Sequence, residues 1–150
     1  MKGLIRFKLS GRKVEYEFTL RRNITIIRGV SGNGKTTLVN YISDYNRQKE
    51  LSGITLNCIK NCIAVSGNEW RASIEHNPDS IIFIDENNDF VKTHEFADVV
   101  KRSDNYFVII NRDKLPSLPY SCEEIYTLKE SGKYTQVNQT YNTLEHIYEV

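Results

Sequence analysis

Residues 24–42, ITIIRGVSGNGKTTLVNYI, constrain the fold more than any other stretch of the chain. An apolar run is broken there by three glycines and is followed from Lys35 by apolar residues at helical spacing. Within it, GVSGNGKT at 29–36 fits the pattern GxxxxGK[ST] without a mismatch, between a strand pattern and a helix pattern. Such a loop turns its backbone N–H groups inward at a helix N-terminus, so it predicts a phosphate-binding site.

Two side chains at the start of the expected helix add to this site. Lys35 is placed to reach the β and γ phosphates of a nucleotide, and the Thr36 hydroxyl to hold Mg²⁺. The residues expected to bind the phosphates are Gly29, Val30, Ser31, Gly32, Asn33, Gly34, Lys35, Thr36 and Thr37. The alternative is a plain glycine turn before a helix.

The other patterns predict a single α/β domain over 1–150. Alternating residues around SGRK in 3–20 and around ESGK in 123–141 indicate two antiparallel hairpins. Further strands are expected at 54–59 (ITLNCI), extended or repeated by 62–66, at 80–86 and at 106–111, and helices at 68–76 and 93–103. Helices between buried strands indicate parallel pairing with crossovers. We therefore expect a three-layer α/β/α sandwich with a mainly parallel sheet and hairpins at its start and end.

A pair of carboxylates, Asp85 and Glu86, directly follows the apolar run SIIFI. A carboxylate at the end of a buried strand can reach a nucleotide-bound metal ion. A second carboxylate beyond it can act as general base toward a water in line with the γ phosphorus. We expect Asp85 to bind the metal together with Thr36, and Glu86 to be the catalytic base. The alternative for Glu86 is a solvated loop residue.

The apolar run at 106–110 ends in Asn111 and Arg112. Parallel strands bring their C-terminal ends to one crevice, so we expect Asn111 to contact the γ phosphate or the attacking water. Arg112, Arg71 or Arg28 could neutralise charge in the transition state, and each also fits a solvent-facing position.

These motifs resemble the P-loop NTPases, and within them the branch with an additional strand and a catalytic glutamate. In that family Gly29 to Thr36 match Walker A, Asp85 the Walker B aspartate and Glu86 the catalytic glutamate. Asn111 matches the polar sensor residue. The resemblance implies a sheet order of 5-1-4-3-2, with ATP and Mg²⁺ as cofactors. GxSGxGKTTL after a hairpin is similar to ABC-type ATPases, but the segment between Lys35 and Asp85 is too short for their helical subdomain and carries no LSGGQ-like signature.

Three functions remain open. The first is a slow Mg²⁺-dependent ATPase, in which water attacks the γ phosphate and Glu86, Lys35 and Asn111 are catalytic. The second is a nucleotide-dependent protein-interaction module with little turnover, and the third is a small-molecule kinase. A GTPase does not fit, because neither 85–88 nor 111–114 matches the motifs DxxG and NKxD.

Composition indicates the partners and the cellular compartment to expect for the chain. Twenty Lys and Arg against nineteen Asp and Glu give a net charge of +1, so nucleic acid is not indicated as a partner. No window approaches about 18 uninterrupted apolar residues, so we expect no membrane span and a cytoplasmic protein. Cys58, Cys62 and Cys122 suit reduced thiols in that compartment, and no His or further Cys pair near CxxxC indicates zinc.

The sequence also suggests where protein partners and the adenine base could bind. A protein partner or a second copy of the chain could complete the site, and the strands of the two hairpins could offer edges for such pairing. Tyr16, Phe18 and Trp70 are candidates for stacking on adenine, with core packing as the alternative for each.

Overall fold

The computed structural model describes residues 3–11, 14–28, 35–120, 124–130 and 139–146. The helices in this part of the chain are α1 (Lys35–Gln48), α2 (Trp70–Glu75) and α3 (His94–Arg102), with the 3-10 turns η1 (Lys49–Ser52) and η2 (Asp89–Lys92). The strands are β1 (Ile5–Ser10), β2 (Val14–Leu20), β3 (Ile24–Ile27), β4 (Thr55–Cys58), β5 (Asn61–Ala64), β6 (Ser80–Ile84), β7 (Tyr106–Ile110), β8 (Ile125–Glu130) and β9 (Gln139–His146).

The described strands form one sheet in the order β4-β1-β2-β9-β8-β3-β7-β6-β5. Five neighbours, β8, β3, β7, β6 and β5, run parallel to one another. At the other end, β1 pairs antiparallel with both β2 and β4. Strand β9 joins the two parts, because it is antiparallel to β8 and parallel to β2. The expected α/β class and the first antiparallel hairpin, β1 with β2, are confirmed. In the second, β8 pairs antiparallel with β9 as expected, but β9 lies at Gln139–His146, further along the chain than the segment predicted up to residue 141.

The parallel strands are covered on both faces. Every residue of β3, β6 and β7 is buried, as expected for near-continuous apolar runs in a parallel sheet. On one face, α2 and α3 pack against Ile82, Ile84 and Ile109. On the other face, α1 packs against Ile81 and other residues of the parallel strands. The Thr93 side chain accepts a hydrogen bond from the N–H of Phe96 (3.1 Å) and so caps the N-terminus of α3.

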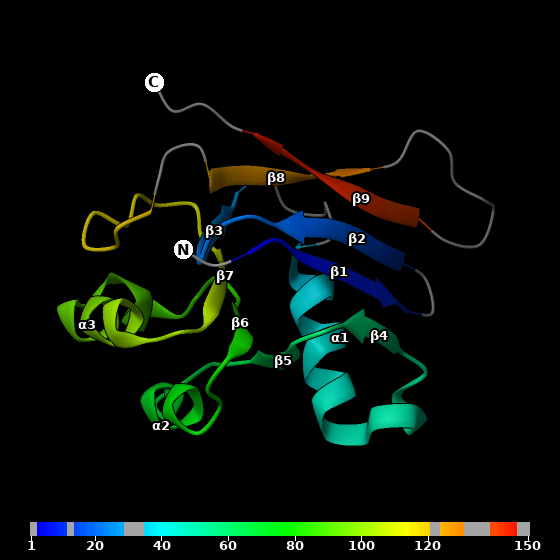
Figure 1. Ribbon diagram of the computed structural model, residues 1–150, viewed down its shortest axis with the longest axis horizontal. Coiled ribbons are helices and arrows are strands. Elements are labelled where there is room, and N and C mark those ends of the chain that lie inside the picture. Colours follow the sequence, from blue (N-terminus) through cyan, green and yellow to red (C-terminus); the bar gives the residue numbers. More distant parts are fainter. Residues whose placement is uncertain (1–2, 12–13, 29–34, 121–123, 131–138, 147–150) are drawn as a thin grey trace.

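Helix α1 lies between two parts of the same sheet (Figure 1). Leu38 and Ile42 have no exposed surface, and they belong to one cluster with Phe7 of β1, Phe18 of β2 and Phe83 of β6. Phe7 and Phe18 stack on each other at 4.8 Å between ring centroids, and Phe7 also contacts the Phe83 ring at 5.4 Å. The hairpin therefore packs on α1 and, through Phe7, on the parallel strands as well.

The prediction for residues 54–59 was wrong in its pairing. In the sheet order that the resemblance implies, ITLNCI would be the second parallel strand and would pair with β6, but β4 pairs with β1 and joins the antiparallel part. The strand beside β6 is β5, which overlaps the segment 62–66 that was expected to extend or repeat ITLNCI. The chain leaves one part of the sheet and enters the other across two residues, Ile59 and Lys60.

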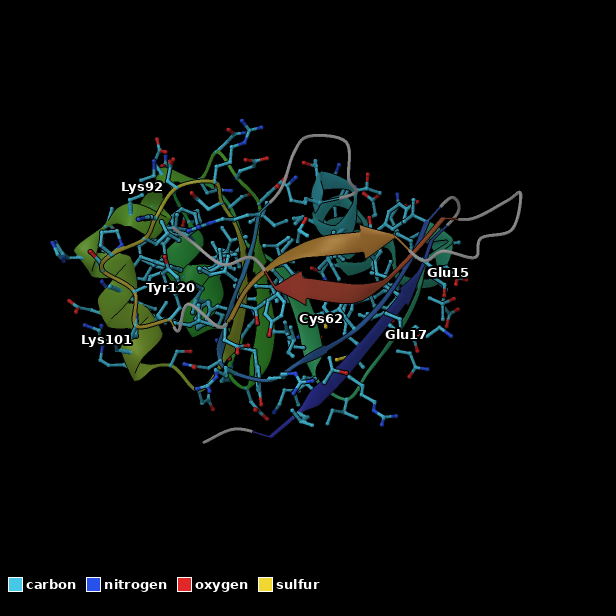
Figure 2. The ribbon with its side chains drawn as sticks, turned by 90° about the horizontal axis from the view of Figure 1, so that it is seen from above. Glu15, Glu17, Cys62, Lys92, Lys101 and Tyr120 are labelled. Carbon is cyan, nitrogen blue, oxygen red and sulfur yellow. The ribbon has the colours of Figure 1, made fainter. Side chains whose placement is uncertain are left out.

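Strands β2, β8 and β9 have a neighbour on both sides over part of their length. Strand β2 pairs with β9 only through Val14–Tyr16, and β8 pairs with β3 only through Ile125 and Tyr126. Most of the other expected edge segment, 133–141, lies outside the described residues. The ends of the strand order are β4 and β5, which are consecutive in the chain. We call this junction, residues 58–62, the seam. In Figure 2, Cys62 of the seam is labelled near the middle of the molecule, whereas Glu15 and Glu17 extend from the hairpin end.

One side chain of α1 covers the outer edge of β5. Asn46 Nδ2 donates to the carbonyl of Cys62 (2.9 Å), and the N–H of Ala64 donates to Asn46 Oδ1 (3.3 Å). These are the two backbone groups that a further strand would pair with. Asn46 therefore holds the C-terminal half of α1 against the sheet.

We expect Asn46→Ala to lower the free energy of unfolding by about 1 to 3 kcal/mol, because it leaves two backbone groups of β5 without partners in a partly buried position. The matched control is Asn40→Ala, on the exposed face of the same helix, which should change stability by less than about 0.5 kcal/mol. Urea unfolding of both variants measures the difference. Equal effects would contradict the role given to Asn46.

Candidate functional site

The predicted phosphate loop is described only at its two flanks. Strand β3 ends at Ile27, and α1 begins at Lys35. The predictions for Gly29, Val30, Ser31, Gly32, Asn33 and Gly34 lie outside the described residues. Thr36 is exposed on the first turn of α1, and Thr37 is half-buried. The two described flanks are a buried strand and a helix that begins at Lys35, as expected.

The registers of the parallel strands place the other predicted residues beside this loop. Ile27 of β3 lies opposite Ile110 of β7, and Ile84 of β6 lies opposite Ile109. Asp85 and Asn111 therefore follow the carboxyl ends of neighbouring parallel strands, where the chain also leaves β3. We call this end of the parallel strands the sheet edge. The N–H of Asn111 donates to the carbonyl of Ile27 (3.2 Å), which continues the ladder to this edge.

Lys35 is buried at the point where these segments meet. Only 3% of the surface of this residue is exposed to solvent. Burial lowers the pKa of Lys35 most; the carboxylates of Glu86 and Asp85 raise it, and the Arg112 guanidinium lowers it. The ammonium group is thus within electrostatic reach of both residues after β6 and of Arg112 after β7. Lysine is almost never this buried unless it is paired, and the carboxylates of Glu86 and Asp85 are the opposite charges that act on it here.

Asp85 is a half-buried carboxylate. Burial raises its pKa most, and the Glu86 charge raises it further, whereas the Glu86 N–H and the Lys35 charge lower it. Its Oδ1 accepts that N–H at 2.9 Å. The ionised form is therefore less stable here than in water, and a nearby cation would stabilise it.

The turn that carries Glu86 is held by Asn88, which the sequence did not single out. Asn88 Nδ2 donates to the carbonyl of Asp85 (2.9 Å), and Asn88 Oδ1 accepts from the N–H of Gly67 (3.2 Å). Asn87 has a φ of 77°, a left-handed conformation that Asn tolerates better than most residues. Asn88 thus links the loops that follow β5 and β6. The only signal in the sequence was an Asn pair after a strand, which a solvated loop shares.

Glu86 forms an ion pair with Arg112. Arg112 Nε lies 3.4 Å from Glu86 Oε2, and the two side chains are 63% and 25% exposed. This contact joins the segment after β6 to the segment after β7. The candidate base therefore stands at the sheet edge, and its carboxylate is held by a cation in this conformation.

Asn111 is buried, with 7% exposure. Its Oδ1 accepts from the N–H of Asp113 at 2.8 Å, which turns the amide nitrogen away from that contact. The carbonyl of Asp113 accepts from Arg28 Nη2 (3.2 Å), and its Oδ2 pairs with Lys92 Nζ (2.9 Å). Lys92 thereby lowers the pKa of Asp113. This loop ties the residue after β3 to the residues after β7.

The three candidate arginines separate into two groups. Arg28 and Arg112 lie at the sheet edge with Lys35. Arg71 on α2 instead pairs with Glu95 of α3 (2.7 Å) and with Glu75 (3.3 Å). Its charge is therefore used in joining two helices on the surface.

The aromatic candidates for adenine stacking are core residues. Tyr16 is fully buried and meets the Tyr41 ring edge-on at 6.3 Å. Trp70 stacks on Phe90 at 4.9 Å, and Phe18 stacks on Phe7. All three side chains therefore pack in the core, which is the alternative expected for each.

Among the described residues, no group of three or more His, Cys, Asp or Glu side chains converges as a metal site would. No described helix has the length and apolar character needed to traverse a bilayer. A cavity of about 640 Å³ is lined by Arg6, Phe18, Cys58 and Tyr126 among others. Phe18 is one of the adenine-stacking candidates, whereas Lys35, Thr36, Asp85, Glu86 and Asn111 do not line this cavity.

Comparison of the chain with protein-family models, curated proteins and solved structures finds no match. Any functional conclusion therefore rests on the motif and on the geometry of the sheet edge.

We expect Arg112→Gln to raise the pKa of Lys35, because it removes a positive charge that disfavours the ammonium form. The Glu86 carboxylate also loses its ion pair with Arg112, so its negative charge stabilises the Lys35 ammonium more strongly. Lysine side-chain NMR across a pH titration measures this pKa. The control is Arg102→Gln at the end of α3, which should leave it unchanged. A fall in the Lys35 pKa on loss of Arg112 would contradict the arrangement.

Proposed function

We propose that this chain is a P-loop NTPase of the catalytic-glutamate branch and that it hydrolyses ATP slowly with Mg²⁺. The observation that carries the proposal is the convergence of Lys35, Asp85, Glu86 and Arg112 beside a sequence that fits GxxxxGK[ST]. They come from a helix start and from the ends of two neighbouring parallel strands. A glycine turn without a ligand would not need a buried lysine facing two carboxylates.

The topology supports the same family. When the parallel strands are numbered along the chain, β3 is first, β5 second, β6 third, β7 fourth and β8 fifth. The sheet order β8-β3-β7-β6-β5 is then 5-1-4-3-2, which is the order that the resemblance implies. Packing of α1 on one face and of α2 and α3 on the other supports a three-layer α/β/α core.

In this proposal the chain binds the nucleotide through its phosphates. The loop from Gly29 to Gly34 donates backbone N–H groups, and the N-terminus of α1 adds positive partial charge. Lys35 contacts the β and γ phosphates, whose negative charge would stabilise the buried ammonium. Thr37 completes the loop contacts.

Thr36 and Asp85 fit a Mg²⁺ ion that arrives with the nucleotide. A hydroxyl on the first turn of α1 and a carboxylate destabilised by burial are hard oxygen donors of the kind that Mg²⁺ prefers. When bound, the ion neutralises charge that develops on the phosphate oxygens. Asp85 holds it from the strand side, and Thr36 from the helix side.

Glu86 is the proposed general base. Its position one residue beyond Asp85 lets its carboxylate take a proton from a water near the γ phosphate. The ion pair with Arg112 has to loosen for this, and Arg112 is then available to the same phosphate. Asn111, whose Oδ1 accepts from the Asp113 N–H, is the proposed polar contact to the γ phosphate or the attacking water.

A second candidate function is a nucleotide-dependent interaction module. The observation that favours it is the Glu86–Arg112 ion pair, which occupies the base. If the pair persists with nucleotide bound, ATP would order the loops after β6 and β7 for a partner protein without being hydrolysed. ATP binding that changes amide exchange in 85–92 and 111–115 without phosphate release would identify the module.

The test is Glu86→Gln in an assay of phosphate release with Mg²⁺ and ATP. We expect turnover to fall about a hundredfold or more, because the amide cannot accept the proton, while nucleotide binding is kept. Glu50→Gln, at an exposed position in η1, is the matched control and should retain the rate. Equal turnover in both variants would remove Glu86 from the mechanism.

Lys35→Ala tests the phosphate site separately. We expect loss of ATP binding by calorimetry, because the main cation for the β and γ phosphates is removed. A circular dichroism spectrum equal to that of the native chain shows that the variant has folded. Unchanged ATP affinity in a folded variant would contradict the whole proposal.

A further inference from the structure

Two cysteines stand at the seam, where the ends of the nine-stranded sheet meet. Cys58 is the last residue of β4, and Cys62 is the second residue of β5. Both are thiols in this structure. They come from strands at opposite ends of the sheet order, but the short connection through Ile59 and Lys60 brings them together.

The two cysteine side chains interact with each other. A hydrogen bond between Cys62 and Cys58 is the largest influence on the pKa of both thiols. The Cys62 thiol also lies 3.6 Å from the carbonyl of Lys60, which accepts from it. The two thiols flank the same short connection between β4 and β5.

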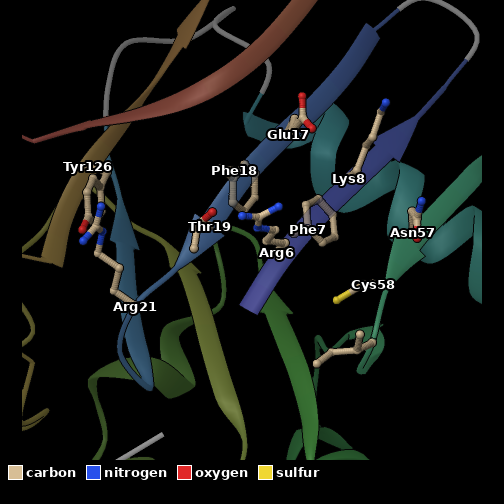
Figure 3. Close-up of a pocket in the computed structure, with 11 residues that line it drawn as sticks. Arg6, Phe7, Lys8, Glu17, Phe18, Thr19, Arg21, Asn57, Cys58 and Tyr126 are labelled. Carbon is tan, nitrogen blue, oxygen red and sulfur yellow. The ribbon is translucent and has the colours of Figure 1, made fainter. Parts of the chain in front are cut away.

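The two thiols differ in their access to solvent. Cys62 is buried in the cluster around α1, with 1% exposure. Cys58 is half-buried and lines the cavity of about 640 Å³. Figure 3 shows its sulfur directed into the space beside Arg6 and Phe7. A small molecule can thus reach Cys58, whereas Cys62 is reached through Cys58.

The surroundings of Cys58 favour a thiolate and an anionic reagent. The hydrogen bond from Cys62 lowers the pKa of Cys58 most, the N–H groups of Lys60 and Ile59 and the Lys60 charge lower it further, and burial opposes them. The cavity is lined by the cations Arg6, Lys8 and Arg21 against one acid, Glu17. Thiolate is the form of cysteine that attacks disulfides.

We propose that Cys58 and Cys62 form a redox-active dithiol, in which Cys58 attacks a small anionic disulfide such as glutathione disulfide and Cys62 resolves the product into an intramolecular Cys58–Cys62 disulfide. This dithiol site is separate from the proposed nucleotide site around Lys35, and it does not depend on the proposed ATPase function.

The chemistry balances in two exchange steps. The Cys58 thiolate attacks one sulfur of glutathione disulfide, a Cys58–glutathione bond forms, and one glutathione thiolate leaves. The Cys62 sulfur then attacks the Cys58 sulfur, the Cys58–Cys62 bond forms, and the second glutathione leaves. The dithiol loses two electrons and two protons, and the glutathione disulfide becomes two thiols.

The first step prepares the second. The hydrogen bond to Cys58 raises the pKa of Cys62 most, and burial and the Cys58 charge raise it further. Once Cys58 is a mixed disulfide it carries no charge, so two of these three effects disappear. Cys62 then loses its proton more easily and lies beside the sulfur that it must attack.

The test uses a Cys122→Ser chain, in which Cys58 and Cys62 are the remaining thiols. After incubation with glutathione disulfide, we expect a monomer lighter by two hydrogen atoms, with neither thiol open to alkylation after unfolding and both restored by dithiothreitol. Peptide mapping of the unsubstituted chain should find the same Cys58–Cys62 link. Two alkylated thiols, a stable glutathione adduct or a link between chains would each overturn the proposal.

Two single variants on the Cys122→Ser background assign the roles. Cys62→Ser should stop at one glutathione bound to Cys58, whereas Cys58→Ser should leave Cys62 as a free thiol. In urea, the difference in reaction rate between the two cysteines should vanish, because it arises from the fold. Faster reaction at Cys62 than at Cys58 in the folded chain would contradict the assignment.

Discussion

Burial of α1 between two parts of one sheet is the constraint on which the rest of the structure depends. Leu38 and Ile42 pack in one cluster with Phe83 of the parallel strands and with Phe7 of the hairpin, so the helix can neither tilt nor slide without opening both contacts. Lys35 is the first residue of this helix. The packing of Leu38 and Ile42 therefore fixes where Lys35 lies relative to the ends of β6 and β7.

That rigidity allows charges to be held where they are individually unfavourable. Burial lowers the pKa of Lys35 and raises the pKa of Asp85, so each charged form is less stable here than in water. Their attraction for each other, and that of Glu86 for Arg112, offsets part of this cost. A polyanion that arrives with a divalent cation would offset more, because it supplies each charge with an opposite partner. The arrangement is understandable as a site prepared for such a ligand.

The sequence predicted what depends on local pattern. Continuous apolar runs identified β6 and β7, and alternation identified β1, β2 and β8. It placed the partner of β8 too early in the chain, because β9 begins at Gln139. It misplaced ITLNCI, because the pairing of β4 with β1 depends on residues distant in sequence. It also missed Asn46, Asn88 and the Glu86–Arg112 pair. A single Asn that closes a sheet edge or a turn has the same local sequence signal as a solvated one.

The seam follows from the same arrangement. The two parts of the sheet both pack on α1, the end strands β4 and β5 of the described sheet are joined by two residues, and Asn46 of α1 binds the outer edge of β5 there. Asn46 is eleven residues along the helix from Lys35, or about 16 Å at 1.5 Å per residue. Charges this far apart interact weakly through solvent at physiological salt. Packing of α1 is therefore the physical connection between the seam and the carboxylates near Lys35, because the helix meets the two at opposite ends.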